Sequence, residues 1–444
     1  MSAVPQELSS RVATRHAAHR PLLVAVGPTG GADAFRVAKA IAAHAVSPLV
    51  IASIVEPPPV YSFEARNALL LPWLVDQQIA ERRASVEERL RWLGLDQELG
   101  PVPQVEVRYG EVGTTLAEMA RDVDARLIMM GIGPYAVRHR LLSAGTVWAT
   151  CRRATQPVLA VAERAREAAH VAVVATDFSP ESIAAARAAL LLLADGATLH
   201  LVHVWRPVST AFPSAELAQL NQRYAESLPE QFHRFRTALG RCERIVVEEH
   251  ALEGSPAELV LDVARAKGAD LIVAGTHGRG MVERWLLGST SSALLRGAEC
   301  SVLLTPPPRV AERLALVRHM EGTSSLRTPA EWDVELSAFV RRNRDRPTKL
   351  EIDDPAIGAQ VQETGLVLTG ATYDAHDRRI ALMFGQRAGS ASHFTRTLGD
   401  VRSLAVSSDA REVDRALFIE SKSGGTLLTF LAEPAAHPVA SAIA

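Results

Sequence analysis

The residues best suited to chemistry stand between positions 275 and 292, in the run GTHGRGMVERWLLGSTSS. Two residues separate Gly275 from Gly278, and nine separate Gly278 from Gly288. Four hydroxyl residues follow: Ser289, Thr290, Ser291 and Ser292. Glycines let the backbone approach a ligand closely, and a helix that begins after Gly288 presents unpaired N–H groups and a positive dipole end to an anion. The run predicts a phosphate-binding loop, and a serine-capped strand-to-helix turn is the alternative.

The complete pattern, Gly-x-x-Gly, nine residues, then Gly-Ser, resembles the nucleotide-binding signature of the universal stress protein family. Neither a Gly-x-x-x-x-Gly-Lys-Ser/Thr loop nor a Gly-x-Gly-x-x-Gly turn after a first strand competes with it. The resemblance implies that Gly275, Gly278 and Gly288 bind the phosphates through backbone N–H groups. It implies that Ser289 and Thr290 bind them through their hydroxyls as well.

The resemblance also implies a carboxylate at the end of the strand that opens this segment. That strand ends in Ala175, Thr176 and Asp177. Asp177 matches the family aspartate that faces the nucleotide, at the switch point where doubly wound sheets bind ligands. It would hydrogen-bond the ribose or hold a metal ion near the phosphates. A helix N-cap is the alternative role for Asp177, and the two roles are compatible.

Four further residues complete the expected site. Val204 matches the family position that lies against the adenine, and a core valine is the alternative. Ala274 ends the apolar run that leads into the glycine loop. Within the loop, Arg279 would pair with phosphate charge or face the solvent. His277 would touch a phosphate or shuttle a proton, and a solvated loop histidine is the alternative.

The elements that must position such a site occur twice. Short apolar runs alternate with helical patterns up to position 161, and the same order begins again at Val171. Gly110 lies twenty-one positions before Gly131, and Gly254 lies twenty-one before Gly275. Strands that alternate with helices form doubly wound parallel sheets. The sequence predicts two tandem Rossmann-like α/β domains, at 20–164 and 168–306.

The first of these domains departs from the binding pattern. Gly27 and Pro28 stand where the second domain has Asp177, so the carboxylate is missing. Pro134 takes the place of Gly278, which removes a backbone donor. Gly145 and its following threonine remain, with one extra residue in the loop. We expect a domain kept for structure or pairing, with an altered ligand as the alternative.

The resemblance also implies that the two domains pair. In the family, subunits associate through the last strand of each sheet, because its exposed edge can pair with another strand. In this chain the runs 158–161 and 302–304 are those strands. A tandem duplication lets them pair within one molecule as a pseudo-dimer. A homo-oligomer stays open as a further arrangement.

The remaining segments carry less information. Residues 1–19 are expected to be a disordered leader, 307–328 a linker and 434–444 a tail. Residues 329–433 are expected to form a small β-rich α+β domain, with a helix that Thr328 to Glu331 opens before Trp332 and short strands at 366–368, 380–384 and 427–431. This segment is similar to a bacterial family known only as a domain of unknown function, and that resemblance implies no activity.

Composition limits the class of protein. The 444 residues carry 48 basic and 50 acidic side chains, which favours neither a nucleic-acid nor a membrane-surface partner. The apolar run 68–75 is too short to span a bilayer, and residues 1–20 lack a signal-like apolar core. Three scattered cysteines, Cys151, Cys242 and Cys300, indicate a reducing compartment. We expect a soluble cytoplasmic protein.

Three hypotheses about function follow. The first is a tandem universal stress protein that binds ATP with Mg²⁺ in its second domain and has a regulatory or chaperone-like role in stress. The second is a slow ATPase or nucleotidyl-transferring enzyme. Neighbouring motif residues assemble no Ser-His-Asp set, no carboxylate pair and no metal cluster, so we assign no catalytic residue. The third is an assembly protein that binds no nucleotide.

Overall fold

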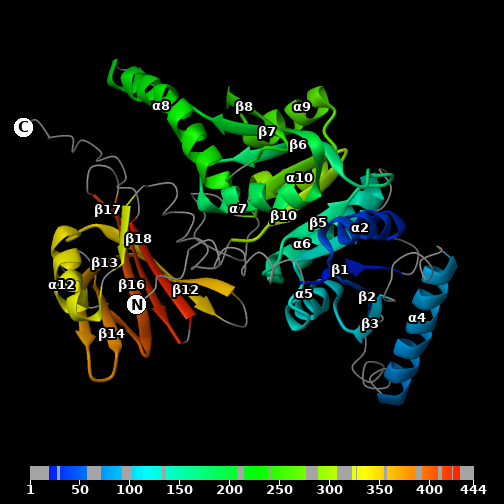
Figure 1. Cartoon of the computed structure of the whole chain (residues 1–444), viewed down its shortest axis with the longest axis horizontal. Coiled ribbons are helices and arrows are strands. Elements are labelled where there is room, and N and C mark those ends of the chain that lie inside the picture. Colours follow the sequence, from blue (N-terminus) through cyan, green and yellow to red (C-terminus); the bar gives the residue numbers. More distant parts are fainter. Residues whose placement is uncertain are drawn as a thin grey trace, which may run out of the picture. The chain divides into compact units, whose positions relative to one another are not determined.

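The computed structural model describes most of the chain, in two separate compact units. The described ranges are 20–27, 31–57, 72–92, 103–132, 137–207, 215–240, 242–276, 289–307, 323–326, 328–354, 358–385, 393–408, 413–422 and 424–430. The first unit holds the described residues up to Pro307, and the second holds those from Thr323 onward (Figure 1). The expected leader and tail lie outside the described residues, as does most of the expected linker.

The first domain of the α/β unit alternates strands and helices as the sequence predicts. Its elements are β1 (Leu22–Ala25), α2 (Ala32–Ala45), β2 (Leu49–Val55), α4 (Pro72–Trp92), β3 (Gln104–Tyr109), α5 (Val112–Asp122), β4 (Leu127–Gly131), α6 (Val137–Arg153) and β5 (Val158–Val161). The apolar runs of β1 and β4 are buried, which is typical of parallel strands covered on both faces.

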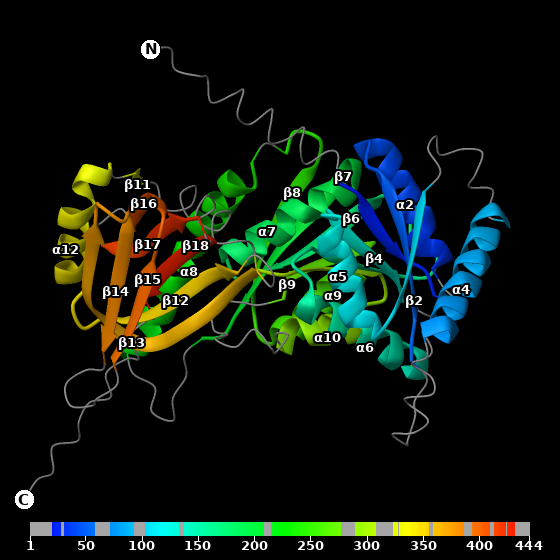
Figure 2. The same cartoon turned by 90° about the horizontal axis from the view of Figure 1, so that it is seen from below.

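The second domain repeats this order of strands and helices. They are β6 (Ala169–Thr176), α7 (Pro180–Ala189), the 3₁₀ turn η1 (Leu190–Leu192), β7 (Leu193–Trp205), α8 (Ala215–Leu239), β8 (Val246–Glu253), α9 (Pro256–Lys267), β9 (Leu271–Gly275), α10 (Ser289–Gly297) and β10 (Ser301–Thr305). Figure 2 shows helices on both faces of the sheet. Among the described residues, no helix is both long and apolar enough to cross a bilayer.

The repeated glycines that relate the two domains have a steric cause. Gly110 and Gly254 follow β3 and β8 with φ of 154° and 149°, a region that side chains rarely adopt. A Cβ on Gly110 would lie 2.5 Å from the hydroxyl of Thr115, and one on Gly254 would lie 2.8 Å from Leu259. Only glycine lets the chain turn from each strand directly into the next helix.

One ten-stranded sheet runs through both domains, in the order β3-β2-β1-β4-β5-β10-β9-β6-β7-β8. Within each domain the strands are parallel, and the first strand lies between the second and the fourth. The domains meet where β5 and β10 pair in antiparallel fashion, with Leu159 opposite Leu303. This confirms the intramolecular pairing of the last strands that the duplication predicts.

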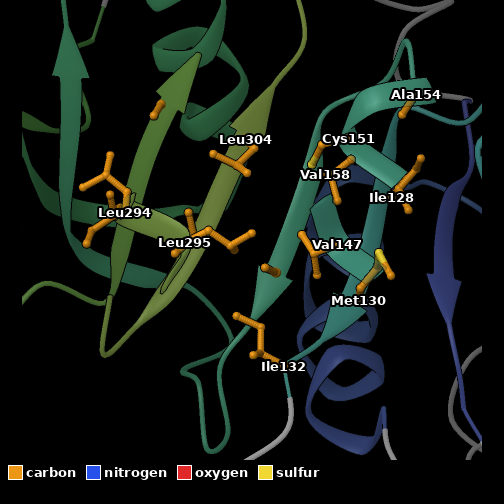
Figure 3. Close-up of a cluster of buried hydrophobic side chains, with 14 of the residues drawn as sticks. Ile128, Met130, Ile132, Val147, Cys151, Ala154, Val158, Leu294, Leu295 and Leu304 are labelled. Carbon is orange, nitrogen blue, oxygen red and sulfur yellow. The ribbon is translucent and has the colours of Figure 1, made fainter. Parts of the chain in front are cut away.

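The junction between the domains is a shared hydrophobic core. Figure 3 shows Leu294, Leu295 and Leu304 of the second domain facing Val147 and Val158 of the first. All five side chains are almost completely buried. Two hydrogen bonds also cross the junction. The Trp148 indole donates to the Ser292 hydroxyl at 3.0 Å, and the Ala162 N–H donates to the Ser301 hydroxyl at 3.1 Å.

The C-terminal unit is one antiparallel sheet with a helix on it. Its elements are β11 (Thr323–Leu326), the 3₁₀ turn η2 (Pro329–Glu331), α12 (Trp332–Arg342), β12 (Pro347–Asp354), β13 (Gly358–Asp374), β14 (Arg379–Gly385), β15 (His393–Leu398), β16 (Val401–Ser408), β17 (Asp414–Ser421) and β18 (Gly424–Phe430). The strand order is β11-β16-β17-β18-β12-β13-β14-β15. The helix packs against β13 (Figure 2). Trp332 is buried against the ring of Tyr373.

The β-rich α+β class of this unit is as predicted. The helix start is also confirmed, because Thr328 and Glu331 form a reciprocal capping box. The three short runs expected as strands fall in β13, β14 and β18, except that Leu431 lies outside the described residues. The described part of the unit contains five further strands. The sequence of β12, for example, has only two alternating apolar residues, Leu350 and Ile352, which is too short a pattern to identify a strand.

Candidate functional site

The candidate site lies at the carboxyl edge of the second domain. There β6 lies between β7 and β9, and the register places Thr176 next to His203 on one side. The chain leaves β6 for α7 and leaves β9 for α10. Neighbouring parallel strands whose connections diverge in this way form the switch point where open α/β sheets bind ligands. Asp177, directly after β6, is therefore at the place that the sequence predicts.

The turn after β6 is held by hydrogen bonds within it. The half-buried Asp177 carboxylate accepts a hydrogen bond from the Ser179 N–H at 3.0 Å and another from the Ser179 hydroxyl. The buried Thr176 hydroxyl accepts from the Phe178 N–H. Phe178 takes a positive φ of 59°, and its ring packs on that of Phe232 with the ring centroids 4.9 Å apart. These contacts fix the direction of the Asp177 side chain.

The cap of α7 corrects one alternative from the sequence. The N-cap is Ser179, whose side chain accepts from the Ser182 N–H, so the N-cap role considered for Asp177 is wrong. Pro180 at the first helical position fixes the start of the helix three residues after Asp177. The carboxylate therefore precedes the helix and acts on the turn, where it holds Ser179.

His203 supports the same edge, and the sequence analysis missed it. Its Nδ1 lies 2.8 Å from the Thr176 carbonyl oxygen, and its Nε2 lies 2.9 Å from the Tyr224 hydroxyl. Because a carbonyl only accepts, Nδ1 carries the proton and, in the neutral ring, the Tyr224 hydroxyl donates to Nε2. The ring is buried beside Phe178, with centroids 4.4 Å apart. A histidine inside an otherwise apolar strand was the signal that could have found it.

The end of β9 joins the start of α10 through Thr276. The Thr276 N–H donates to the Thr305 carbonyl at 2.9 Å, and the Ser291 hydroxyl donates to the Thr276 carbonyl at 3.4 Å. Ser289 and Thr290 are the first residues of α10, exposed and half-buried respectively. The described part of the helix thus presents both predicted hydroxyl residues at its start.

Several predicted site residues are placed by the sheet itself. Gly275 ends β9 opposite Thr305. Ala274 is buried in the shared core, and Ala175 and Val204 pack against that core from β6 and β7. Val204 therefore has the core contact that its alternative role required, and its contact with adenine stays a prediction. The remaining predicted residues lie outside the described ones: His277, Gly278, Arg279 and Gly288.

Among its described residues, the first domain has no carboxylate at the position of Asp177 and no histidine at the position of His203. Gly27 is exposed where the second domain has Asp177. Ser53 occupies the register position of His203, and its hydroxyl donates to the Val26 carbonyl at 2.9 Å. Gly145 and Thr146 lie inside α6, so their N–H groups belong to a helix interior. Pro134 lies outside the described residues.

Comparison with known proteins places these two domains in one family. The family model "Universal stress protein family" matches residues 19–162 and again 170–306. Universal stress protein A homolog 1 of Coxiella burnetii is 32% identical over 131 residues, which are 29% of this chain and 90% of that protein. Universal stress protein Rv1996 of Mycobacterium tuberculosis is 31% identical over 212 residues, which are 46% of this chain and 65% of that protein.

A solved structure of a universal stress protein in complex with cAMP is 26% identical, covers 32% of this chain and 99% of that one, and has a TM-score of 0.25. The family model matches more than half of the chain, in the two domains that share one sheet. The chain therefore belongs to the universal stress protein family and carries two of its domains in tandem.

Proposed function

We propose that the second domain binds ATP together with Mg²⁺ and that the protein acts as a regulatory or chaperone-like factor in the stress response. The observation that carries the proposal is the convergence of Asp177, Gly275 and the start of α10 on one edge of the sheet. This edge combines a carboxylate, a glycine and a helix N-terminus that favours anions. A nucleotide needs these groups for its ribose, its metal ion and its phosphates.

The residues at this edge fit a magnesium ion. Magnesium prefers oxygen ligands and is held in nucleotide sites by one or two carboxylates together with the phosphates. Asp177 is the carboxylate directly after β6. Asp177 would hold the ion directly or through water, while Ser289, Thr290 and the glycines would bind the phosphates. The ion would neutralise phosphate charge and leave the nucleotide bound in one orientation.

The proposal is for binding and signalling rather than for turnover. The side chains around Asp177 are occupied in holding the turn, with Ser179 on the carboxylate and His203 on the Thr176 carbonyl. A binding domain with a fixed edge can report nucleotide level to a partner by its own occupancy. The near-neutral composition and the scattered cysteines support a cytoplasmic setting for this role.

The test is calorimetric titration of the full-length chain with Mg-ATP, after mass spectrometry of any small molecule that it retains. We expect Asp177→Ala to weaken binding by at least about tenfold, because a hydrogen bond or metal contact to a charged group contributes roughly 1.5–3 kcal/mol. Ser289→Ala should weaken binding less.

The matched control is Thr146→Ala, at the corresponding position of the first domain, and it should leave the affinity unchanged. The titration is repeated with ADP, AMP and cAMP, the last because the similar structure holds it. Absence of heat with all four nucleotides would contradict the proposal. Equal effects of Thr146→Ala and Ser289→Ala would contradict the assignment to the second domain.

A further inference from the structure

Three potential metal ligands converge on the outer part of the second domain, away from every motif considered above. They are His200 on β7 and Glu248 and His250 on β8. The parallel register places His200 directly beside Glu248 and Val202 beside His250. Because side chains two apart on a strand share a face, all three project from the same face of the sheet. Residues fifty positions apart in sequence are thereby brought together.

The spacing of the donor atoms matches a metal site. His200 Nδ1 lies 3.1 Å from His250 Nε2 and 3.2 Å from Glu248 Oε2, and His250 Nε2 lies 3.9 Å from that oxygen. Zinc bonds to histidine nitrogen and to carboxylate oxygen are about 2.0–2.2 Å long, so tetrahedral ligands lie roughly 3.3–3.6 Å apart. The three observed separations bracket that value.

Hydrogen bonding alone satisfies this arrangement poorly. The carboxylate oxygen can only accept a hydrogen bond, and each facing nitrogen can also only accept unless it carries the proton of its ring. A proton on His200 Nδ1 points fully at only one of its two neighbours. A proton on His250 Nε2 instead leaves the lone pair of His200 facing Glu248. A cation placed among the three atoms is attracted by all of them at once.

The access of the cluster also suits a metal ion. His200 is 4% exposed and is held firmly, whereas Glu248 is 45% exposed. β8 is the last strand of the sheet, so an ion and a completing water can reach the cluster from the solvent.

We propose that His200, Glu248 and His250 bind a zinc ion, with water as the fourth ligand. Two imidazoles and one carboxylate form a borderline-soft donor set that zinc favours over magnesium or calcium. The ion would fasten β8, the exposed edge strand, to β7. Lys267, at the end of α9, lies 3.4 Å from Glu248 and competes with the metal for that carboxylate.

The test uses the full-length chain, stripped with a chelator and titrated with zinc chloride while heat and melting temperature are followed. We expect one zinc ion per chain at this site and a higher melting temperature when it is bound. His250→Gln should weaken zinc binding by roughly tenfold or more, since one of three protein ligands is lost. The control His170→Gln changes an exposed histidine on β6 and should leave the affinity unchanged.

A second variant separates metal binding from a merely hydrogen-bonded cluster. Lys267→Ala removes a competing cation about 3.4 Å from the carboxylate, so zinc should bind roughly two- to tenfold more tightly. Circular dichroism verifies that each variant is folded. The proposal is overturned if the chain binds no zinc, if His250→Gln binds it as the wild type does, or if Lys267→Ala leaves the affinity unchanged.

Discussion

The two stress-protein domains share one scaffold and differ at its carboxyl edge. Both have the same strand order, and both turn from the third strand into a helix through a positive-φ glycine, Gly110 or Gly254. In the second domain Asp177 follows the first strand, and the buried ring of His203 holds the carbonyl of Thr176. In the first domain Gly27 takes the position of Asp177, and the small hydroxyl of Ser53 holds the carbonyl of Val26 instead.

The contacts that differ lie at the strand ends, while those that agree lie in the core. A duplicated domain can therefore lose the side chains of a site and keep the packing that its partner domain needs.

The largest expected effect breaks the shared core rather than either site. Leu304→Ala empties a fully buried position at the junction, beside Leu295 and Val158. We expect it to lower the free energy of unfolding by about 2–5 kcal/mol. Urea denaturation of the full-length chain measures this. Leu220→Ala, at a 54% exposed position on α8, is the control and should cost less than about 0.5 kcal/mol. Similar losses for both variants would show that the junction packs loosely.

The second prediction compares His203 and Ser53, which bind the backbone carbonyl at the end of the first strand in the second and in the first domain. His203→Ala removes two hydrogen bonds and leaves a cavity beside Phe178, so we expect it to cost about 3 kcal/mol. Ser53→Ala removes one hydrogen bond and little volume, so about 1 kcal/mol is expected. Denaturation midpoints of the two variants give the comparison. If Ser53→Ala lowers the free energy of unfolding as much as His203→Ala does, the proposed difference between the carboxyl edges of the two domains is wrong.

The smallest expected effect concerns two equivalent helix caps. Glu111 caps α5 by accepting from the N–H groups of Gly113 and Thr114, whereas its counterpart Ser255 makes no side-chain cap to α9. The hydrogen bond from the Thr114 hydroxyl is the main cause that lowers the pKa of Glu111 below 4.5. A lowered folded-state pKa stabilises the protein above the unfolded pKa, and this stabilisation is lost as the pH falls through the folded value.

We therefore expect Glu111→Ala to cost roughly 0.5–1 kcal/mol at pH 7, at the low end for a cap because the carboxylate is exposed. The cost should shrink below pH 4.5. Ser255→Ala should cost a few tenths of a kcal/mol at either pH, since no cap is lost. Thermal melts of both variants at pH 7 and pH 4 give the two differences. A cost of Glu111→Ala that does not change with pH would contradict the cap as its cause.

The sequence predicted most of the α/β unit because its signals are local. Short continuous apolar runs such as that of β1, bounded by turn residues, are typical of strands buried on both faces, and the glycine spacing revealed the repeat. The position of Asp177 at the carboxyl edge follows from those strands. Its exact hydrogen-bond role did not, because Thr176, Asp177 and Ser179 are all suitable caps in sequence and only the turn geometry selects Ser179.

Side chains that meet across strands could not be predicted. His203 meets Thr176 and Tyr224 only through the register of β6, β7 and the packing of α8. The repeat implied a strand before Gly254, but the residues of β8 were not identified, because an exposed edge strand with charged residues lacks the apolar pattern of its neighbours. The cluster of His200 with Glu248 depends on that strand, so a sequence argument had no means to assemble it.

The antiparallel pairing of β5 with β10 has a consequence for stoichiometry. Separate subunits exchange partners, and their mixture of pairings changes with concentration. Two domains on one chain meet at a high effective concentration however dilute the protein is. Every molecule therefore contains one domain of each type, and no cellular change in abundance can produce a pair with two identical halves.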